Sequence, residues 1–200
     1  MKYPSETIEN SINEISKLPG IGKKTALRLV LFLLRQPESQ SKNLANAISE
    51  MRLNVNFCKN CHNISDLDVC EICSNPRREQ SVICVVEDIG DLWAIEKSKA
   101  FNGTYHVLGG VLSAMDGVGP DQLNIVSLLK RLESGSVKEV IIATNATTEG
   151  QITGQYIADE CAKFKKLITR LPQGIPVGGE LELIDYNTMS TAFTSRSEIK

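Results

Sequence analysis

The chain has 200 residues, of which 42% are hydrophobic and 23% charged, and its formal net charge at pH 7 is −2. This length allows one large domain or two to three small modules, and the charge argues against a uniformly basic nucleic-acid binder. The longest apolar run, Leu29 to Leu34, is too short to span a membrane. The N-terminal sequence MKYPSETIEN lacks the basic-then-apolar pattern of a targeting segment, so we expect a cytoplasmic protein.

The first 52 residues show helical periodicity that a turn interrupts. Ile8, Ile12 and Ile15 recur at helical spacing, and Ser5 is the predicted N-cap. The helical pattern resumes at Lys23 and stops before Pro37, and a third helix is predicted over residues 39–52. Between the first two helices lies the turn segment Leu18-Pro19-Gly20-Ile21-Gly22.

This turn and the helix after it do not fit the common phosphate-binding fingerprints. A P-loop requires a preceding strand and a lysine followed by Ser or Thr, whereas here the preceding segment is helical and Lys24 follows Lys23. A dinucleotide-binding fingerprint requires a third glycine where the chain has Thr25. The remaining interpretations are a helix-hairpin-helix that binds DNA and a helical corner with incidental lysines.

The residues of the turn favour the helix-hairpin-helix. Gly20 and Gly22 leave the loop free of Cβ atoms, so a phosphate can approach the N–H groups at the positive end of the next helix. Lys23, Lys24 and Arg28 add cationic side chains there. Such a site holds the DNA backbone and reads no bases. Residues 1–80 carry 11 basic and 9 acidic side chains, against 11 and 15 in residues 81–200, so we expect DNA contacts in the first half.

Four cysteines are the most informative feature, and they follow the pattern C-x2-C-x8-C-x2-C: Cys58, Cys61, Cys70 and Cys73. Two such knuckles place four thiolates around one tetrahedral Zn²⁺. A pair of disulfides is the competing interpretation, which a reducing cytosol disfavours. Since no coordination position is open to water, we expect one structural zinc per chain. We expect His62, inside the first knuckle region, to be a surface residue.

After residue 80, short apolar runs alternate with helices. Strands are predicted over Val82–Val86, Tyr105–Leu108, Val140–Ala143, Lys166–Thr169 and Leu181–Ile184. Helices are predicted over residues 88–98, 120–132 and 150–165, with a short one at the C-terminus. This alternation predicts a mostly parallel sheet covered on both faces. Cys84 lies in an apolar strand and Cys161 in a helix, so we expect both to be buried thiols without metal.

Acidic and neutral polar residues follow two of the predicted strands: Glu87 and Asp88 follow Val82–Val86, and Asn145, Thr147 and Glu149 follow Val140–Ala143. The spacing resembles the Toprim domain of topoisomerases, primases and nucleases, in which a Glu and an Asp-x-Asp pair hold Mg²⁺. The Asp-x-Asp positions here are Asn145 and Thr147, which supply no anionic oxygen. We therefore expect no catalytic residues and no efficient two-metal catalysis. Glu87 and Glu149 can also serve simply as helix caps.

These three features, in this order, resemble the RecR family of bacterial recombination proteins over essentially the whole chain. The resemblance rests on Leu18–Gly22, Lys24, Arg28, the four cysteines, Val85–Asp88, Ala143–Asn145, Glu149–Gly150 and Pro176–Glu182. It implies an α+β multi-module protein. We expect a helix-hairpin-helix DNA-binding module (1–54), a four-cysteine zinc finger (55–77), an α/β Toprim domain with a mostly parallel sheet (78–172) and a C-terminal strand and helix segment (173–200).

The resemblance also implies a non-enzymatic role in recombinational DNA repair. RecR proteins form rings, typically tetramers of two interlocked dimers, which can encircle DNA. With RecO, and RecF where present, they help to load RecA onto single strands covered by SSB. Lys24 and Arg28 match the family's DNA-contacting positions, and with Gly20, Gly22 and Lys23 they form the expected site for single- and double-stranded DNA. The expected RecO surface comprises Glu87, Asp88, Asn145 and Glu149.

Two other functions stay open at this point. One is a Mg²⁺-dependent Toprim-type nuclease or primase-like enzyme, against which Asn145 and Thr147 argue. The other is a small zinc scaffold protein without a nucleic-acid role, which salt-dependent DNA binding would exclude.

Overall fold

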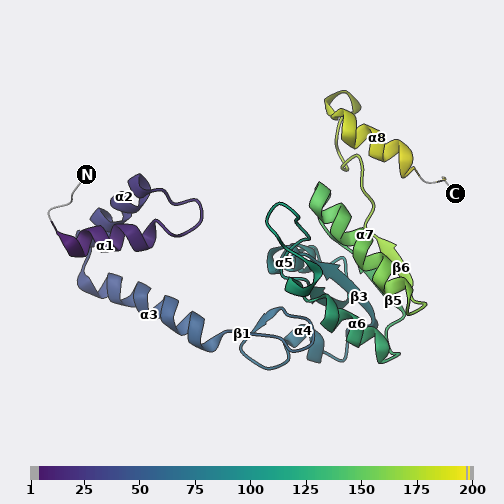
Figure 1. The fold of residues 1–200 in the computed structure, drawn as a ribbon, viewed down its shortest axis with the longest axis horizontal. Helices are drawn as coiled ribbons and strands as arrows, with labels where there is room; N and C mark the ends of the chain where they lie inside the picture. Colours follow the sequence, from purple (N-terminus) through teal and green to yellow (C-terminus); the bar gives the residue numbers. More distant parts are fainter. Residues whose placement is uncertain (1–4, 197, 199–200) are drawn as a thin grey trace. The chain divides into compact units, whose positions relative to one another are not determined.

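The computed structural model describes residues 5–196 and residue 198, and it divides into two compact units, Met1–Val55 and Asn56–Lys200 (Figure 1). In the part of the chain that the structure describes, the N-terminal unit contains helices and turns but no strand, and the C-terminal unit contains both sheets. No helix in the described part of the chain is both long and apolar enough to cross a bilayer.

The N-terminal unit contains the three predicted helices, α1 (Glu6–Ile15), α2 (Lys23–Leu34) and α3 (Glu38–Asn54). The Ser5 side chain accepts a hydrogen bond from the Ile8 backbone, as the sequence predicts for an N-cap. Burial of Ile12, Ala26 and Val30 joins α1 to α2 in a small core. Helix α3 has no buried residue within this chain.

The C-terminal unit is built on a four-stranded sheet, and all of its strand pairs are parallel. Its strands are β3 (Glu79–Val86), β4 (Gly103–Val107), β5 (Glu139–Ile142) and β6 (Leu167–Arg170), in the order β4-β3-β5-β6. Residues 83–86 of β3 are all buried, as expected of a central strand covered on both faces. The predicted parallel sheet is therefore confirmed.

Helices cover both faces of this sheet (Figure 1). On one face, α6 (Ile125–Glu133) and α7 (Thr148–Ala162) pack against β3 and β5. On the other face, Leu92 of α5 (Ile89–Ser98) packs against Cys84 and Tyr105. Cys84 and Cys161 are both buried, as predicted.

The cysteine-rich segment lies against one edge of the sheet. It contains the antiparallel pair β1 (Asn56–Phe57) and β2 (Ile64–Ser65) and the short helix α4 (Glu71–Ser74). The Val107 backbone N–H on edge strand β4 donates to the Cys61 carbonyl at 2.8 Å. The segment thus covers part of an edge that would otherwise expose unpaired backbone groups.

The helix predicted over residues 120–132 is interrupted, so this prediction was wrong at its start. A 3₁₀ turn, η1 (Pro120–Gln122), precedes α6, and Asn124 between them has a non-helical ψ of 32°. The Asn124 backbone donates to Leu108, and its side chain donates to the Val107 carbonyl. These bonds hold Asn124 at the end of β4, and a continuous helix could not make them.

The strand predicted over Leu181–Ile184 is also wrong, because this segment forms the 3₁₀ turn η2 (Leu181–Leu183). Its alternating Leu and Glu residues read as a strand, but Leu181 and Leu183 are exposed and no strand of the described residues pairs with them. The short C-terminal helix is confirmed as α8 (Tyr186–Thr194). Asp185 caps it by accepting from the Asn187 and Thr188 backbones.

Candidate metal centre and nucleic-acid interface

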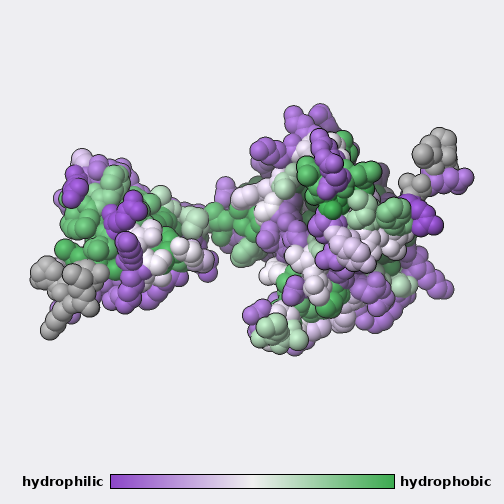
Figure 2. All heavy atoms as spheres, turned by 90° about the horizontal axis from the view of Figure 1, so that it is seen from above, coloured by the Kyte–Doolittle hydropathy of each residue, from purple (hydrophilic) through white to green (hydrophobic). Residues whose placement is uncertain are grey.

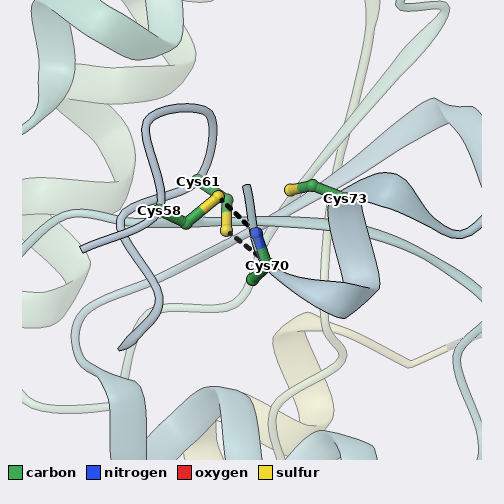
Figure 3. A group of neighbouring side chains, drawn as sticks. All are labelled: Cys58, Cys61, Cys70 and Cys73. Atoms are coloured by element: carbon green, nitrogen blue, oxygen red, sulfur yellow. Dashed lines mark hydrogen bonds between the residues drawn. The ribbon is translucent and has the colours of Figure 1, made fainter. Parts of the chain in front are cut away.

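The four cysteines converge on one point (Figure 3). Their sulfur atoms all lie within 4.8 Å of one another, and the Cys61 and Cys70 sulfurs are 3.5 Å apart. Four ligands at a Zn–S distance of about 2.3 Å would place the sulfurs about 3.8 Å apart. Among the residues that the structure describes, no other group of three or more His, Cys, Asp or Glu side chains could hold a metal ion.

Backbone hydrogen bonds shape the two knuckles. The Cys58 N–H donates to the Asn63 carbonyl at 2.7 Å, and the His62 N–H donates to the Cys58 carbonyl at 2.9 Å. His62 closes this turn with a left-handed φ of 61°, which costs a non-glycine residue some strain. The Cys70 N–H points at the Cys58 sulfur at 3.3 Å, and such a donor suits a thiolate better than a neutral thiol.

The donor set fits zinc. Thiols packed this closely cannot all ionise without a cation between them. Hydrogen bonds from Cys61 and Cys73 lower the pKa of Cys70, and the bond to Cys70 in turn raises the pKa of Cys61. A divalent ion that accepts four thiolates removes this conflict. Bound there, zinc would crosslink the loop to α4 and would have no position open for catalysis.

His62 is not the surface residue that the sequence predicts. Its side chain is partly buried, its Nε2 lies 2.8 Å from the Ser127 hydroxyl on α6, and its ring contacts the His106 ring at 5.3 Å. Burial, followed by the charge of Arg131, lowers the pKa of His62. The residue therefore attaches the first knuckle to the α/β domain.

The glycine-containing loop forms a tight turn in front of α2. The Ile21 N–H donates to the Leu18 carbonyl at 3.1 Å, and Gly20 has a φ of 75°. With Pro19 before it, Gly20 occupies the position of a type II turn that requires positive φ. A Cβ atom added at Gly20 or Gly22 would have no neighbour within 4 Å, so the loop surface is open.

Helix α2 begins without a capping side chain. Gly22 is its N-cap and makes no side-chain bond, and the first turn contains no acidic residue. Lys23, Lys24 and Arg28 are exposed on this end of the helix. Free N–H groups, the positive end of the helix dipole and three cations therefore lie together, an arrangement suited to a phosphate backbone.

The structure brings together the polar side chains at the carboxyl ends of β3 and β5. Glu87 is buried, and its two carboxylate oxygens accept from the backbone and the side-chain amide of Asn145. Thr147 caps α7 by accepting from the Gly150 N–H at 3.1 Å. Asp88 caps α5, and Asp88 and Glu149 are exposed. Both positions that would carry an Asp-x-Asp pair thus make protein contacts.

Comparison with known proteins agrees with this geometry. Family models of the RecR helix-hairpin-helix and of the RecR four-cysteine zinc finger domain match residues 8–52 and 55–75, and a Toprim domain model matches residues 81–172. The "Recombination protein RecR" of Flavobacterium johnsoniae is 50% identical over 98% of this chain and 95% of its own length. The protein of that name from Bacteroides thetaiotaomicron is 47% identical over 98% and 96%.

The chain belongs to the RecR family. A RecR-family four-cysteine zinc finger and four clustered thiols together support a structural zinc in this protein. The helix-hairpin-helix, zinc finger and Toprim domains follow one another in the predicted order.

Sequence reasoning missed one group of residues in this RecR-family chain. Arg131 on α6 donates to the backbone of Tyr105, to His106 and to Thr104 on edge strand β4. The sequence signals this role only by placing Arg131 among apolar helix positions, of which Leu128 and Leu132 are fully buried in the structure. That pattern alone does not reveal which part of the fold the guanidinium meets.

Proposed function

We propose that this protein is a non-enzymatic DNA-binding clamp and adaptor in recombinational DNA repair. In this proposal it acts in the cytoplasm with RecO, and with RecF where present, to load RecA on single-stranded DNA. The work is divided among four segments, which are the DNA-binding hairpin (1–54), the zinc finger (55–77), the Toprim domain (78–172) and the C-terminal segment (173–200). The printed names of the relatives support a role in recombination.

The open loop at the start of α2 is the main support for DNA binding. Gly20 and Gly22 leave room for a phosphate, and exposed Lys23, Lys24 and Arg28 surround the approach. Contacts of this kind are made to phosphates, so binding should be independent of sequence and should weaken steeply with salt. Single- and double-stranded DNA both present such a backbone.

The Toprim strand ends support an adaptor rather than an enzyme. Glu87 is already paired with Asn145, and Thr147 is already a helix cap. A Mg²⁺ site there would have to displace those hydrogen bonds and would still lack anionic ligands at both positions. The exposed acids Asp88 and Glu149 instead suit a basic partner surface, for which we propose RecO.

An exposed apolar face supports a homo-oligomer, a dimer or a tetrameric ring. Leu44, Ile48 and Met51 of α3 are spaced along one face and are between 49% and 57% exposed. Figure 2 shows hydrophobic side chains at the surface of the N-terminal unit. A helix with such a face normally buries it, and a second copy of the chain would do so. Light scattering with and without DNA measures the assembly.

The decisive experiment is a charge reversal at the hairpin. Lys24→Glu combined with Arg28→Glu should abolish binding of fluorescently labelled single- and double-stranded DNA, because two phosphate contacts become repulsive. The pair Lys130→Glu and Lys163→Glu, exposed on α6 and at the end of α7, changes the net charge equally and should bind nearly as the parent does. Equal DNA affinity of the hairpin variant and the parent at matched salt would refute the hairpin as the DNA site.

A further inference from the structure

The Arg131 side chain lies at the edge of the sheet that the zinc finger covers. Its Nη1 atom donates to the Tyr105 carbonyl on edge strand β4 at 2.6 Å. Val107 is two positions further along the same strand, and its backbone N–H donates to the carbonyl of Cys61, a residue of the zinc site. Two residues of a strand span only about 7 Å, so the guanidinium and the Cys61 backbone contact neighbouring positions of the same strand edge.

Arg131 has no carboxylate partner. Among residues 5–196, no Asp or Glu oxygen lies within 4.0 Å of its guanidinium, although the residue is partly buried. A covered positive charge without a compensating anion is strongly unfavourable. A nearby negative group other than a directly paired carboxylate would stabilise this cation.

Neutral groups hold the guanidinium in place. His106 is fully buried, and its Nε2 donates to the Asn124 carbonyl at 2.8 Å, which leaves its Nδ1 to accept from Arg131. Burial is the main cause that lowers the pKa of His106 to about 3, so the ring is neutral at pH 7. The Thr104 hydroxyl already donates to Val82 and accepts from Arg131. These contacts orient Arg131 but do not neutralise it.

The zinc centre has the negative charge that could compensate the positive charge of Arg131. Four thiolates exceed the charge of one Zn²⁺ by two negative charges, and three of the four cysteines are buried. Burial lowers the pKa of Arg131, while the charges of Cys73, Cys61, Cys58 and Cys70 oppose that shift. The lysine inside the first knuckle, Lys59, is exposed and already paired with Asp68.

We propose that Arg131 of the Toprim domain is the counter-charge of the zinc–thiolate centre, so that it stabilises the bound metal and joins the zinc finger to the sheet edge. Each side then compensates the other. The finger holds zinc more tightly because a fixed cation faces its thiolates, and the covered cation is tolerated because the thiolates face it. Arg131 acts here as a positioning residue and does not touch the metal.

The test separates charge from hydrogen bonding in the full-length zinc-loaded protein. Arg131→Gln removes the charge and leaves a shorter side chain that ends in an amide donor, whereas Arg131→Lys keeps the charge but loses the forked geometry. Zinc transfer to the chelating dye 4-(2-pyridylazo)resorcinol should become about 10-fold faster or more in the Gln variant. Transfer from the Lys variant should stay close to that of the parent.

A spectroscopic measurement distinguishes this role from a purely structural one. In protein reconstituted with Co²⁺, removing a nearby positive charge raises the energy of the thiolate electrons. The sulfur-to-cobalt charge-transfer band should therefore move to lower energy in Arg131→Gln and should not move in Arg131→Lys. The matched control is Lys130→Gln, which removes an exposed charge from the neighbouring position of α6 and should change neither measurement.

Equal zinc loss from the Gln and Lys variants with an unmoved cobalt band would overturn the proposal, because hydrogen bonding alone would then explain the residue. Unchanged zinc transfer in both variants would overturn it as well. If Arg131→Gln does not fold, Arg131→Lys still decides, since the proposal requires it to match the parent in zinc transfer and in the cobalt spectrum.

Discussion

Asn145 donates both its backbone N–H and its side-chain amide to the carboxylate of Glu87, each at 2.7 Å. The two residues follow β3 and β5, which are neighbours in the sheet, so the pair joins the ends of two strands. Gly150 allows this approach, because a Cβ atom there would lie 2.5 Å from a Glu87 oxygen and 2.3 Å from the Asn145 carbonyl. Both oxygens of the Glu87 carboxylate, at the end of β3, are therefore hydrogen-bonded within the protein.

This pair predicts a metal-dependent phenotype for Asn145→Asp. The substitution replaces a donor with a second carboxylate, so unfolding should become easier by about 1–3 kcal/mol in buffer without Mg²⁺. Mg²⁺ at millimolar concentration should restore part of that loss, because two facing carboxylates can share a cation. Thermal unfolding with and without Mg²⁺ measures both effects. Asn145→Ala, which loses the donor without adding charge, should show no recovery, and recovery in that variant would contradict the explanation.

The sequence predicted the features that depend on local spacing. Four cysteines in two knuckles define a metal site whatever the surrounding fold, and Ser5 caps α1 through a bond to a residue three positions away. The apolar runs likewise predicted each strand of the parallel sheet.

The features that the sequence did not predict depend on contacts between distant segments. Asn124 interrupts a helical pattern because it bonds to the end of β4. His62 is partly buried because it contacts Ser127, which is 65 positions away in the sequence. Arg131 reads as a helix-surface cation until the sheet edge is placed beside it. Periodicity contains no information about such partners.

Removing one zinc ligand should release the metal and destabilise the finger. Cys70→Ser replaces a buried thiolate with a weak hydroxyl ligand, and we expect loss of the single zinc equivalent together with a lower melting temperature. Metal analysis of the purified protein and calorimetry measure the two effects. Cys84→Ser, outside the cluster, is the control and should retain its zinc. A full zinc equivalent with unchanged melting in Cys70→Ser would contradict the assignment.

The ion pair between Arg78 and Glu96 should contribute to stability in a pH-dependent way. The two side chains are only 15% and 25% exposed, and the hydrogen bond from Arg78 is the main cause that lowers the pKa of Glu96. A carboxyl group with a lowered folded-state pKa stabilises the protein above its unfolded value of about 4.5, and this contribution disappears as pH falls through the folded value. Glu96→Gln should therefore be destabilised at pH 7 by about 1–3 kcal/mol, and by less as the pH falls below about 4.5.

Urea unfolding of parent and variant at matched pH values measures this difference, and the comparison cancels any loss of zinc that both proteins share. Glu133→Gln, which removes an exposed carboxylate from α6, should differ little from the parent at either pH. A stability difference between Glu96→Gln and the parent that stays constant from pH 7 to about pH 3 would show that the charge of Glu96 is not the cause.

The proposed RecO surface makes a prediction about charge at the carboxyl ends of the strands. Asp88 and Glu149 are exposed there, whereas Glu87 is buried behind Asn145, so the first two should meet a basic partner directly. The pair Asp88→Asn and Glu149→Gln removes both charges. Asn is as good an N-cap as Asp, so α5 should keep its cap. Association with RecO should slow and become less sensitive to salt, while DNA binding by the protein alone should not weaken.

Surface plasmon resonance with immobilised RecO at several salt concentrations measures the association rate. The matched control is Glu133→Gln with Asp159→Asn, which removes two exposed charges near the C-terminal ends of α6 and α7. In a parallel sheet with crossover helices, the C-terminal ends of the helices lie at the opposite end of the strands from Asp88 and Glu149. The control should therefore associate as the parent does. Equal RecO association by both double variants would show that the patch is not the RecO surface. Metal-dependent DNA cleavage that the patch variant loses would instead favour the enzyme alternative, because the carboxylates would then be needed for chemistry.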